Sequence, residues 1–196
     1  MSDQQLPVKK EEEIKLPSIA DIYNDESMTI LQKDIALQVL LNKPPHKSWL
    51  KEHPTAKKKD ANGKSVPIQF IPIERVEWLL TVIYLRWRPE ILSAVVMGNS
   101  VCVTVRLHYF DHAKGEWDWV DGIGAQPLQT DSGTGANNVE RMKSNAVQIA
   151  APAAKSYAIK DAAECLGRIF GKDLNRAENV SYDTLIDKYA KAVSND

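Results

Sequence analysis

A strict alternation of apolar and polar residues from Ser100 to Phe110 predicts a β-strand in the middle of the chain. The apolar positions are Val101, Val103, Val105, Leu107 and Tyr109, and they alternate with Cys102, Thr104, Arg106 and His108. Because successive side chains of a strand point to opposite faces, we expect the first set to face a core. The second set then lies on an open face that is available for function.

Two further strands are expected beside this one. Residues Ile91–Met97 form a first strand, which a Gly98–Asn99 turn joins to the central strand. Residues Glu116–Ala125 form a returning strand after a second turn at Asp111–Gly115. Together these segments predict an antiparallel β-meander of three to four strands.

A long helix is expected after the meander, over the segment from Ala151 to Arg176. Its apolar positions recur every four residues, at Ala150, Ala154, Ala158, Ala162, Leu166 and Phe170. Alanines let a helix backbone approach a neighbouring surface closely, so this helix should lie flat against the sheet. Pro152 fits the first turn, and Gly171 ends the helix or a tight turn that follows it. The predicted fold class is α+β, with the antiparallel meander packed against a long alanine-rich helix in a β-β-β-α core and with additional N-terminal helices.

The remaining segments divide into helices and loops. Helices are expected over Ile19–Leu41, Ile73–Trp87 and Tyr182–Val193, the first two ending before prolines. Residues 46–66 are rich in Lys, Pro, Gly and Asn and predict a long mobile loop, and residues 126–145 predict a flexible connector. The expected organisation is a disordered tail over residues 1–17, an N-terminal helical segment and basic loop over 18–66, a core domain over 67–178, and a short C-terminal helix over 179–196.

The composition is that of an ordinary soluble protein. Of 196 residues, 43% are hydrophobic and 26% are charged, and the formal net charge is -1. This charge excludes a uniformly basic coat for nucleic acid and leaves room for a local basic groove. Cys102 and Cys165 lie in apolar patterns, which favours buried thiols in a reducing compartment. No apolar run reaches the roughly 20 residues of a membrane span, and the N-terminus does not resemble a secretory signal, so the cytoplasm is the expected location.

Patterns that would indicate catalysis are incomplete. Gly63, Lys64 and Ser65 resemble the end of a P-loop, but Lys58 stands where the first glycine belongs, so we reject a nucleotide site. Metal-capable side chains gather near the second turn of the meander, at His108, Asp111, His112, Glu116, Asp118 and Asp121. Alternation sends Asp118 and Asp121 to opposite faces, which disfavours a two-metal site. We therefore expect no cofactor, no metal and no enzymatic activity.

Tryptophans are the most distinctive candidates for binding. They stand at positions 49, 78, 87, 117 and 119, and single-strand-binding proteins use such rings as platforms on which bases stack. Trp78 and Trp87 fall on a helical pattern and are expected in the core. Trp117 and Trp119 share one strand face, so they are exposed or buried as a pair.

The order of the elements and several short motifs resemble the single-strand annealing recombinases of the Rad fifty-two branch and its phage relatives of the Sak type. The motifs are Arg75 and Val76 near a helix start, strands that read VTVRLHY and VDGIGA, and a helix that reads AIKDAAECLGRIFGKDLN. An acidic residue before a glycine-rich strand ending is matched by Asp121, Gly122 and Gly124, and an Arg, an aromatic residue and Gly at the helix end are matched by Arg168, Phe170 and Gly171. The resemblance covers about residues 70–176.

The resemblance implies a protein that binds single-stranded DNA and anneals complementary strands without hydrolysing a nucleotide. It implies a ring or helical filament in which neighbouring subunits extend a β-sheet and a helix frames a basic groove for DNA phosphates. Glu164 and Cys165 stand where family members often carry basic residues, and Lys160 and Lys172 can substitute for them. The DNA-binding set expected is Arg75, Arg168, Lys160, Lys172, Arg106, Arg86, Arg88, Lys155 and Arg176.

Expected partners are single-stranded DNA, its complementary strand and further copies of the chain, in the cytoplasm of a bacterium or of a phage-infected host. A phage exonuclease or a single-strand-binding protein is a further candidate partner, and no membrane is involved. Two alternatives stay open. One is a metal-dependent nuclease that uses His108, Asp118 or Asp121, and the other is a non-enzymatic phage structural or adaptor protein.

Overall fold

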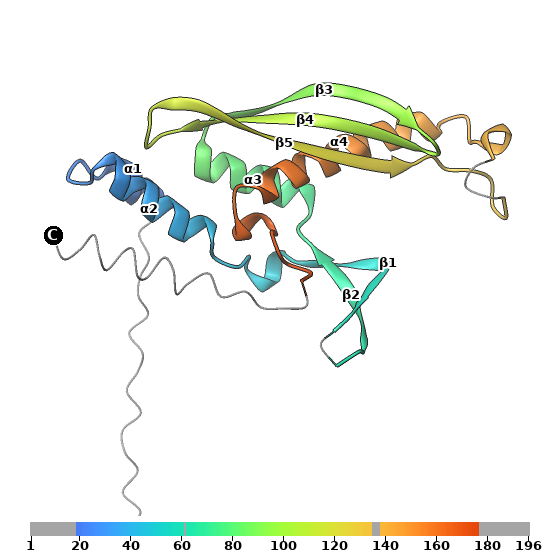
Figure 1. The fold of residues 1–196 in the computed structure, drawn as a ribbon, viewed down its shortest axis with the longest axis horizontal. Helices are drawn as coiled ribbons and strands as arrows, with labels where there is room; N and C mark the ends of the chain where they lie inside the picture. Colours follow the sequence, from blue (N-terminus) through green and yellow to red (C-terminus); the bar gives the residue numbers. More distant parts are fainter. Residues whose placement is uncertain (1–18, 61, 135–137, 177–196) are drawn as a thin grey trace, which may run out of the picture.

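The computed structural model describes residues 19–60, 62–134 and 138–176 (Figure 1). Its α-helices are α1 (Ile19–Asn24), α2 (Ile30–Leu41), α3 (Ile73–Tyr84) and α4 (Ala146–Glu164), and short 3-10 helices lie at Lys47–Trp49, Val139–Arg141 and Arg168–Phe170, the last labelled η3. Its strands are β1 (Lys51–Lys59), β2 (Ser65–Phe70), β3 (Trp87–Met97), β4 (Ser100–Asp111) and β5 (Glu116–Pro127). The predictions for residues 1–17 and for a helix at Tyr182–Val193 lie outside the described residues.

The α+β class is confirmed, with two antiparallel sheets and a helix packed on the larger one. Strands β1 and β2 form one sheet, and β3, β4 and β5 form the other in that order. In β4, Val101, Val103, Val105 and Leu107 are buried and their even-numbered neighbours are half-buried. The predicted facing of this strand is therefore confirmed. Figure 1 shows α3 and α4 on one side of the large sheet and, among the residues that the structure describes, no helix on its other side.

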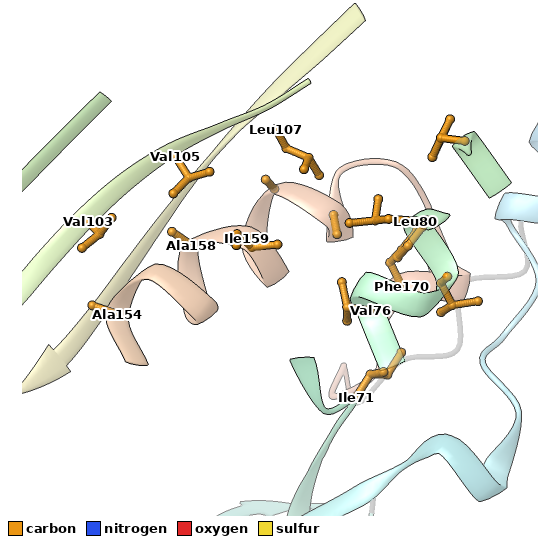
Figure 2. Close-up of a cluster of buried hydrophobic side chains, with 14 of the residues drawn as sticks. Ile71, Val76, Leu80, Val103, Val105, Leu107, Ala154, Ala158, Ile159 and Phe170 are labelled. Atoms are coloured by element: carbon orange, nitrogen blue, oxygen red, sulfur yellow. The ribbon is translucent and has the colours of Figure 1, made fainter. Parts of the chain in front are cut away.

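Helix α4 lies unusually close to strand β5. A Cβ atom added to Gly122 would stand 2.3 Å from the Ala158 carbonyl oxygen, and one added to Gly124 would stand 2.2 Å from the Ala154 carbonyl oxygen. Glycine in the strand and alanine in the helix are thus both needed for this approach. Figure 2 shows the result, with the β4 side chains Val103 and Val105 above the small residues of α4.

The bounds of α4 differ from the prediction at both ends. The helix begins at Ala146, so Pro152 lies in its second turn and not in its first. Burial of Ala146 and Ala150 against the sheet holds the helix together across this proline. The helix ends at Glu164, because the backbone of Gly167 packs against Leu41 of α2, where a Cβ would stand 2.6 Å from a carbonyl oxygen.

Helix α3 is shorter than predicted, because Trp87 belongs to strand β3. The helix ends at Tyr84, and Leu85 follows with a φ of 57°. The indole Nε1 of Trp87 donates a hydrogen bond to Thr81 Oγ1 at 2.9 Å. The backbone of Trp87 is extended, but this hydrogen bond holds its side chain against α3. Its side chain therefore lies where the helical spacing in the sequence places it.

The N-terminal segment holds two corrections. The expected helix over Ile19–Leu41 is divided in two, since Thr29 and Gln32 form a capping box that starts α2. The expected loop over residues 46–66 is largely the β1–β2 hairpin. Its turn is set by the Asp60 carboxylate, which accepts hydrogen bonds from the backbone N–H groups of Asn62 and Lys64 at 2.9 and 2.8 Å.

One hydrophobic core joins these elements. Val76 and Leu80 of α3 pack with Phe170 of η3 and with Ile71, and this cluster continues into the sheet and α4 (Figure 2). Within the described ranges, no helix combines the length and apolarity needed to cross a membrane. The core therefore fixes the relative positions of α3, α4 and the β1–β2 hairpin, between which a cavity lies.

Candidate nucleic-acid interface

An open cavity of ≈ 390 Å³ lies between the β1–β2 hairpin, the start of α3 and the middle of α4. The hairpin contributes Lys51 and Phe70, and α4 contributes Tyr157 and Lys160. Glu74 reaches it from the first turn of α3. The lining is mainly apolar and aromatic, and its charged groups are Lys51, Glu74 and Lys160. Such a site suits a ligand that has both an apolar and a charged part.

Lys160 is the most unusual charge in this cavity. Its Nζ lies 4.7 Å from the ring centre of Phe70 and 5.5 Å from that of Tyr157. Burial lowers the pKa of Lys160, and the carboxylates of Glu164 and Glu74 offset this effect. Across the described residues, however, no carboxylate lies within 4.0 Å of this ammonium group. The cavity therefore presents a partly desolvated cation that would gain from contact with an anion.

Two carboxylates reduce the positive potential around Lys160. Glu164 stands one turn further along α4 and is half-buried, and this burial raises the pKa of its carboxyl group. Glu74 lies 3.6 Å from the Nζ of Lys51. The site is therefore not a uniformly basic groove, because Glu74 lines it and Glu164 acts on Lys160 from beside it.

The β1–β2 hairpin carries a second group of cations. Lys57, Lys58 and Lys59 are consecutive in β1, so they alternate between the two faces of the hairpin. Lys57 and Lys59 are exposed. Figure 1 shows this hairpin projecting away from the large sheet and from α4. Its lysines thus extend the cationic surface beyond the cavity.

Arg75 lies in the first turn of α3, within a cluster of aromatic rings. Its Cζ is 5.6 Å from the ring centre of Trp49 and 4.9 Å from that of Trp78. The two indoles meet edge to face at 5.9 Å. Trp78 is 45% exposed, so the prediction that it belongs to the core is wrong, and Trp87 is half-buried against the core.

The cations predicted near the end of α4 are spread over several elements. Lys155 is half-buried on α4, Arg168 is half-buried in η3, and Lys172 is exposed beyond it. Arg176 pairs with Asp173 at 2.6 Å. Asn175 ties this segment to β2, because its side chain exchanges hydrogen bonds with the backbone of Gln69 at 2.9 and 2.7 Å. Lys172 and Arg176 are therefore in a segment attached to the strand that also supplies Phe70.

Arg106, Arg86 and Arg88 belong to a different surface, at the open face of the large sheet. Arg106 makes a bidentate pair with Asp121 at 2.8 and 2.9 Å, and this pair lowers the pKa of Asp121. Its Cζ is 3.8 Å from the ring centre of Trp119. Arg88 lies over Trp117 and Arg86 over Phe110. The predicted set of cations therefore divides between the cavity and this face.

The metal-capable residues do not converge. His108 contacts Glu90 at 2.8 Å, Asp121 holds Arg106, and Asp118 accepts a hydrogen bond from the hydroxyl of Tyr109 at 3.3 Å. In the part of the chain that the structure describes, no group of three His, Cys, Asp or Glu side chains is placed to bind an ion. Cys102 is half-buried and Cys165 is exposed, so the prediction of two buried thiols is wrong.

Comparison with known proteins adds no assignment. No protein-family model matches this chain, and no curated protein sequence is significantly similar to it. The resemblance to annealing recombinases therefore stays a prediction, and the geometry of the site is the basis on which a function can be proposed.

Proposed function

We propose that this protein binds single-stranded DNA and anneals complementary strands, without a nucleotide cofactor and as an oligomeric ring or filament. The observation that carries the proposal is the position of Lys160, a partly desolvated ammonium group held against Phe70 and Tyr157 with no close carboxylate in the described residues. A phosphate group supplies the missing anion. The neighbouring rings supply apolar contact for the sugar or base of the same nucleotide.

The arrangement around Lys160 supports a path along which single-stranded DNA can bind. The cavity lies between α4 and a hairpin whose exposed lysines would neutralise further phosphates. Contacts of this kind are independent of sequence, which an annealing protein requires because homology must be read by base pairing alone. The order of β3, β4, β5 and α4 is also the one expected for the β-β-β-α core of annealing recombinases.

The predicted residues take different roles in this proposal. Lys160 binds a DNA phosphate inside the cavity. Further phosphates of the same DNA strand are bound on either side of it by Lys155, Arg168, Lys172 and Arg176. Arg75 binds at the start of α3, where stacking on Trp49 and Trp78 holds its guanidinium group in place. Each protomer offers few phosphate contacts, so useful affinity requires many protomers on one strand.

The test is a pair of assays on the full chain, gel shift with a single-stranded oligonucleotide and annealing of two complementary dye-labelled strands. We expect Lys160→Ala and the double variant Arg75→Ala, Arg168→Ala each to weaken binding by about tenfold or more and to slow annealing. Lys160→Arg should retain most of the affinity, since it keeps the charge.

A matched control removes a charge elsewhere. Lys33 lies on α2 and does not line the cavity, and its ammonium group donates a hydrogen bond to the carbonyl oxygen of Tyr23. Lys33→Gln should therefore leave DNA binding unchanged. If Lys160→Ala and the Arg75→Ala, Arg168→Ala double variant both fold and anneal DNA as the wild type does, the assignment of this site to DNA binding is wrong. An oligomer that binds no oligonucleotide would favour the structural or adaptor role.

A further inference from the structure

The uncovered face of the large sheet carries aromatic rings that are exposed to solvent. Trp117 is 49% exposed and Trp119 is 50% exposed, and both project from β5 on the side away from α4. Phe110 pairs with Trp117 across the strands, and the two rings meet edge to face at 5.7 Å. A strand rises about 3.4 Å per residue, so the two indoles stand about 7 Å apart along β5.

Each of these three rings has an arginine over it. Arg86 lies 5.3 Å from the ring centre of Phe110, Arg88 lies 5.7 Å from that of Trp117, and Arg106 lies 3.8 Å from that of Trp119. Arg106 is held by Asp121, which fixes its position over the indole. Among the described residues, no carboxylate lies within 4.0 Å of the guanidinium groups of Arg86 and Arg88. Arg88 acts on Glu90 only through a longer-range attraction that helps to lower the pKa of that carboxyl group. Arg86 and Arg88 thus form no close ion pair within the described residues.

We infer that this arginine–aromatic platform, made of Phe110, Trp117, Trp119, Arg86, Arg88 and Arg106, is a second binding site for single-stranded nucleic acid, at which bases stack on the indoles. The inference rests on the proposed single-strand-binding function and deepens it, because it adds a base-stacking surface on the open sheet face to the phosphate site at Lys160. The two sites lie on different surfaces of the molecule.

The chemistry of the platform favours single strands over other ligands. Base stacking on an exposed indole requires a base that is not already stacked in a duplex, and Arg86 and Arg88 supply charge for the adjoining phosphates. The two indoles are spaced along a rigid strand, so successive bases can each use one ring. An acidic or apolar protein segment would match only the cations or only the rings.

The experiment compares a single strand that has bases, a single strand that lacks them and a duplex. The binding of an oligo-dT strand, an abasic strand of equal length and a duplex is measured by gel shift and by tryptophan fluorescence for four proteins. These are the wild type, Trp117→Leu with Trp119→Leu, the cavity variant Lys160→Ala, and Ile123→Ala. Ile123 is exposed on the same strand and face but has no ring, so it serves as the matched control.

The wild type should bind oligo-dT more tightly than the abasic strand. The double tryptophan variant should lose about tenfold in affinity for oligo-dT, little for the abasic strand, and therefore most of this preference. Lys160→Ala should weaken the binding of both single strands and keep the preference for bases. Arg88→Ala leaves both indoles in place and should weaken the binding of oligo-dT. It tests the platform if the double tryptophan variant does not fold.

Each contrary outcome has a definite meaning. A double tryptophan variant with an unchanged base preference would overturn the platform and leave the cavity proposal intact. Loss of oligomer mass with the base preference intact would show that this face joins copies of the chain, which also overturns it. If Lys160→Ala has no effect while the tryptophan variant abolishes binding, the cavity assignment is wrong and the platform stands.

Discussion

Lys160 combines a positive charge with partial removal from water, and this combination determines when it can bind an anion. Burial disfavours its charged form and lowers its pKa, whereas an exposed lysine stays charged to higher pH. Lys51, Glu74 and Tyr157 also line the cavity, and Glu164 acts on Lys160 from beside it. Burial raises the pKa of Glu164, so this carboxyl group becomes negative only as the pH rises beyond its usual range.

These two shifts predict a pH profile for DNA binding. Affinity should fall as the pH rises through the raised pKa of Glu164, because this carboxyl group gains its charge. It should fall again as the pH rises through the lowered pKa of Lys160, because the ammonium group loses its charge. Glu164→Gln should remove the first step and Lys160→Arg the second, since arginine stays charged. The measurement is the dissociation constant for an oligonucleotide at constant ionic strength. Identical profiles for all three proteins would contradict the assignment of both groups.

At the scale of the elements, the packing of α4 on β5 depends on two glycines. An added Cβ at Gly122 would stand 2.3 Å from two backbone atoms of α4, the Ala158 carbonyl oxygen and the Ala162 nitrogen. Backbone cannot move aside as a flexible side chain can, so the helix itself must shift. This explains in physical terms why a glycine-rich ending suits the last strand of a sheet that carries an alanine-rich helix.

We therefore expect Gly122→Ala to lower the free energy of unfolding by at least about 2 kcal/mol. Ala125→Val is the matched control, because Ala125 is on the same strand, pairs with Cys102 on the open face and is exposed. It should change stability little. The measurement is the urea concentration at the midpoint of unfolding, compared between variants whose unfolding free energy has the same dependence on urea. Equal midpoints for Gly122→Ala and the wild type would show that α4 does not lie this close to β5.

The elements also show what the sequence could and could not reveal. The facing of β4 was predictable because period-two alternation depends on one strand alone. The β1–β2 hairpin was not, since β1 is rich in lysine and its strand conformation comes from pairing with β2. Lys160 could be proposed from the resemblance to annealing recombinases, whereas Phe70 and Tyr157 could not. They meet only because the core places the hairpin beside α4, which makes the cavity a product of tertiary structure.

For the whole molecule, strand β3 is the feature that bears on assembly. It forms an edge of the large sheet, and Ile91, Val95, Val96 and Met97 are exposed along it. An edge strand with unpaired backbone groups and exposed apolar side chains offers a template for pairing with another chain. A second copy of this protein is the partner that the proposed ring or filament requires.

We therefore expect Val96→Lys to reduce the mass of the oligomer and to weaken binding to long oligonucleotides far more than to short ones, because only long strands engage several protomers. Lys160→Ala should give the converse result, with the oligomer mass unchanged. It should also flatten the plot of log affinity against log salt concentration by about 0.7 for each phosphate group that the variant no longer neutralises. Mass photometry with and without oligonucleotide, combined with a salt titration, measures both effects. If Val96→Lys leaves the mass unchanged but a charge placed on the open face lowers it, copies of the chain meet through that face, and both the edge assignment and the platform must be abandoned.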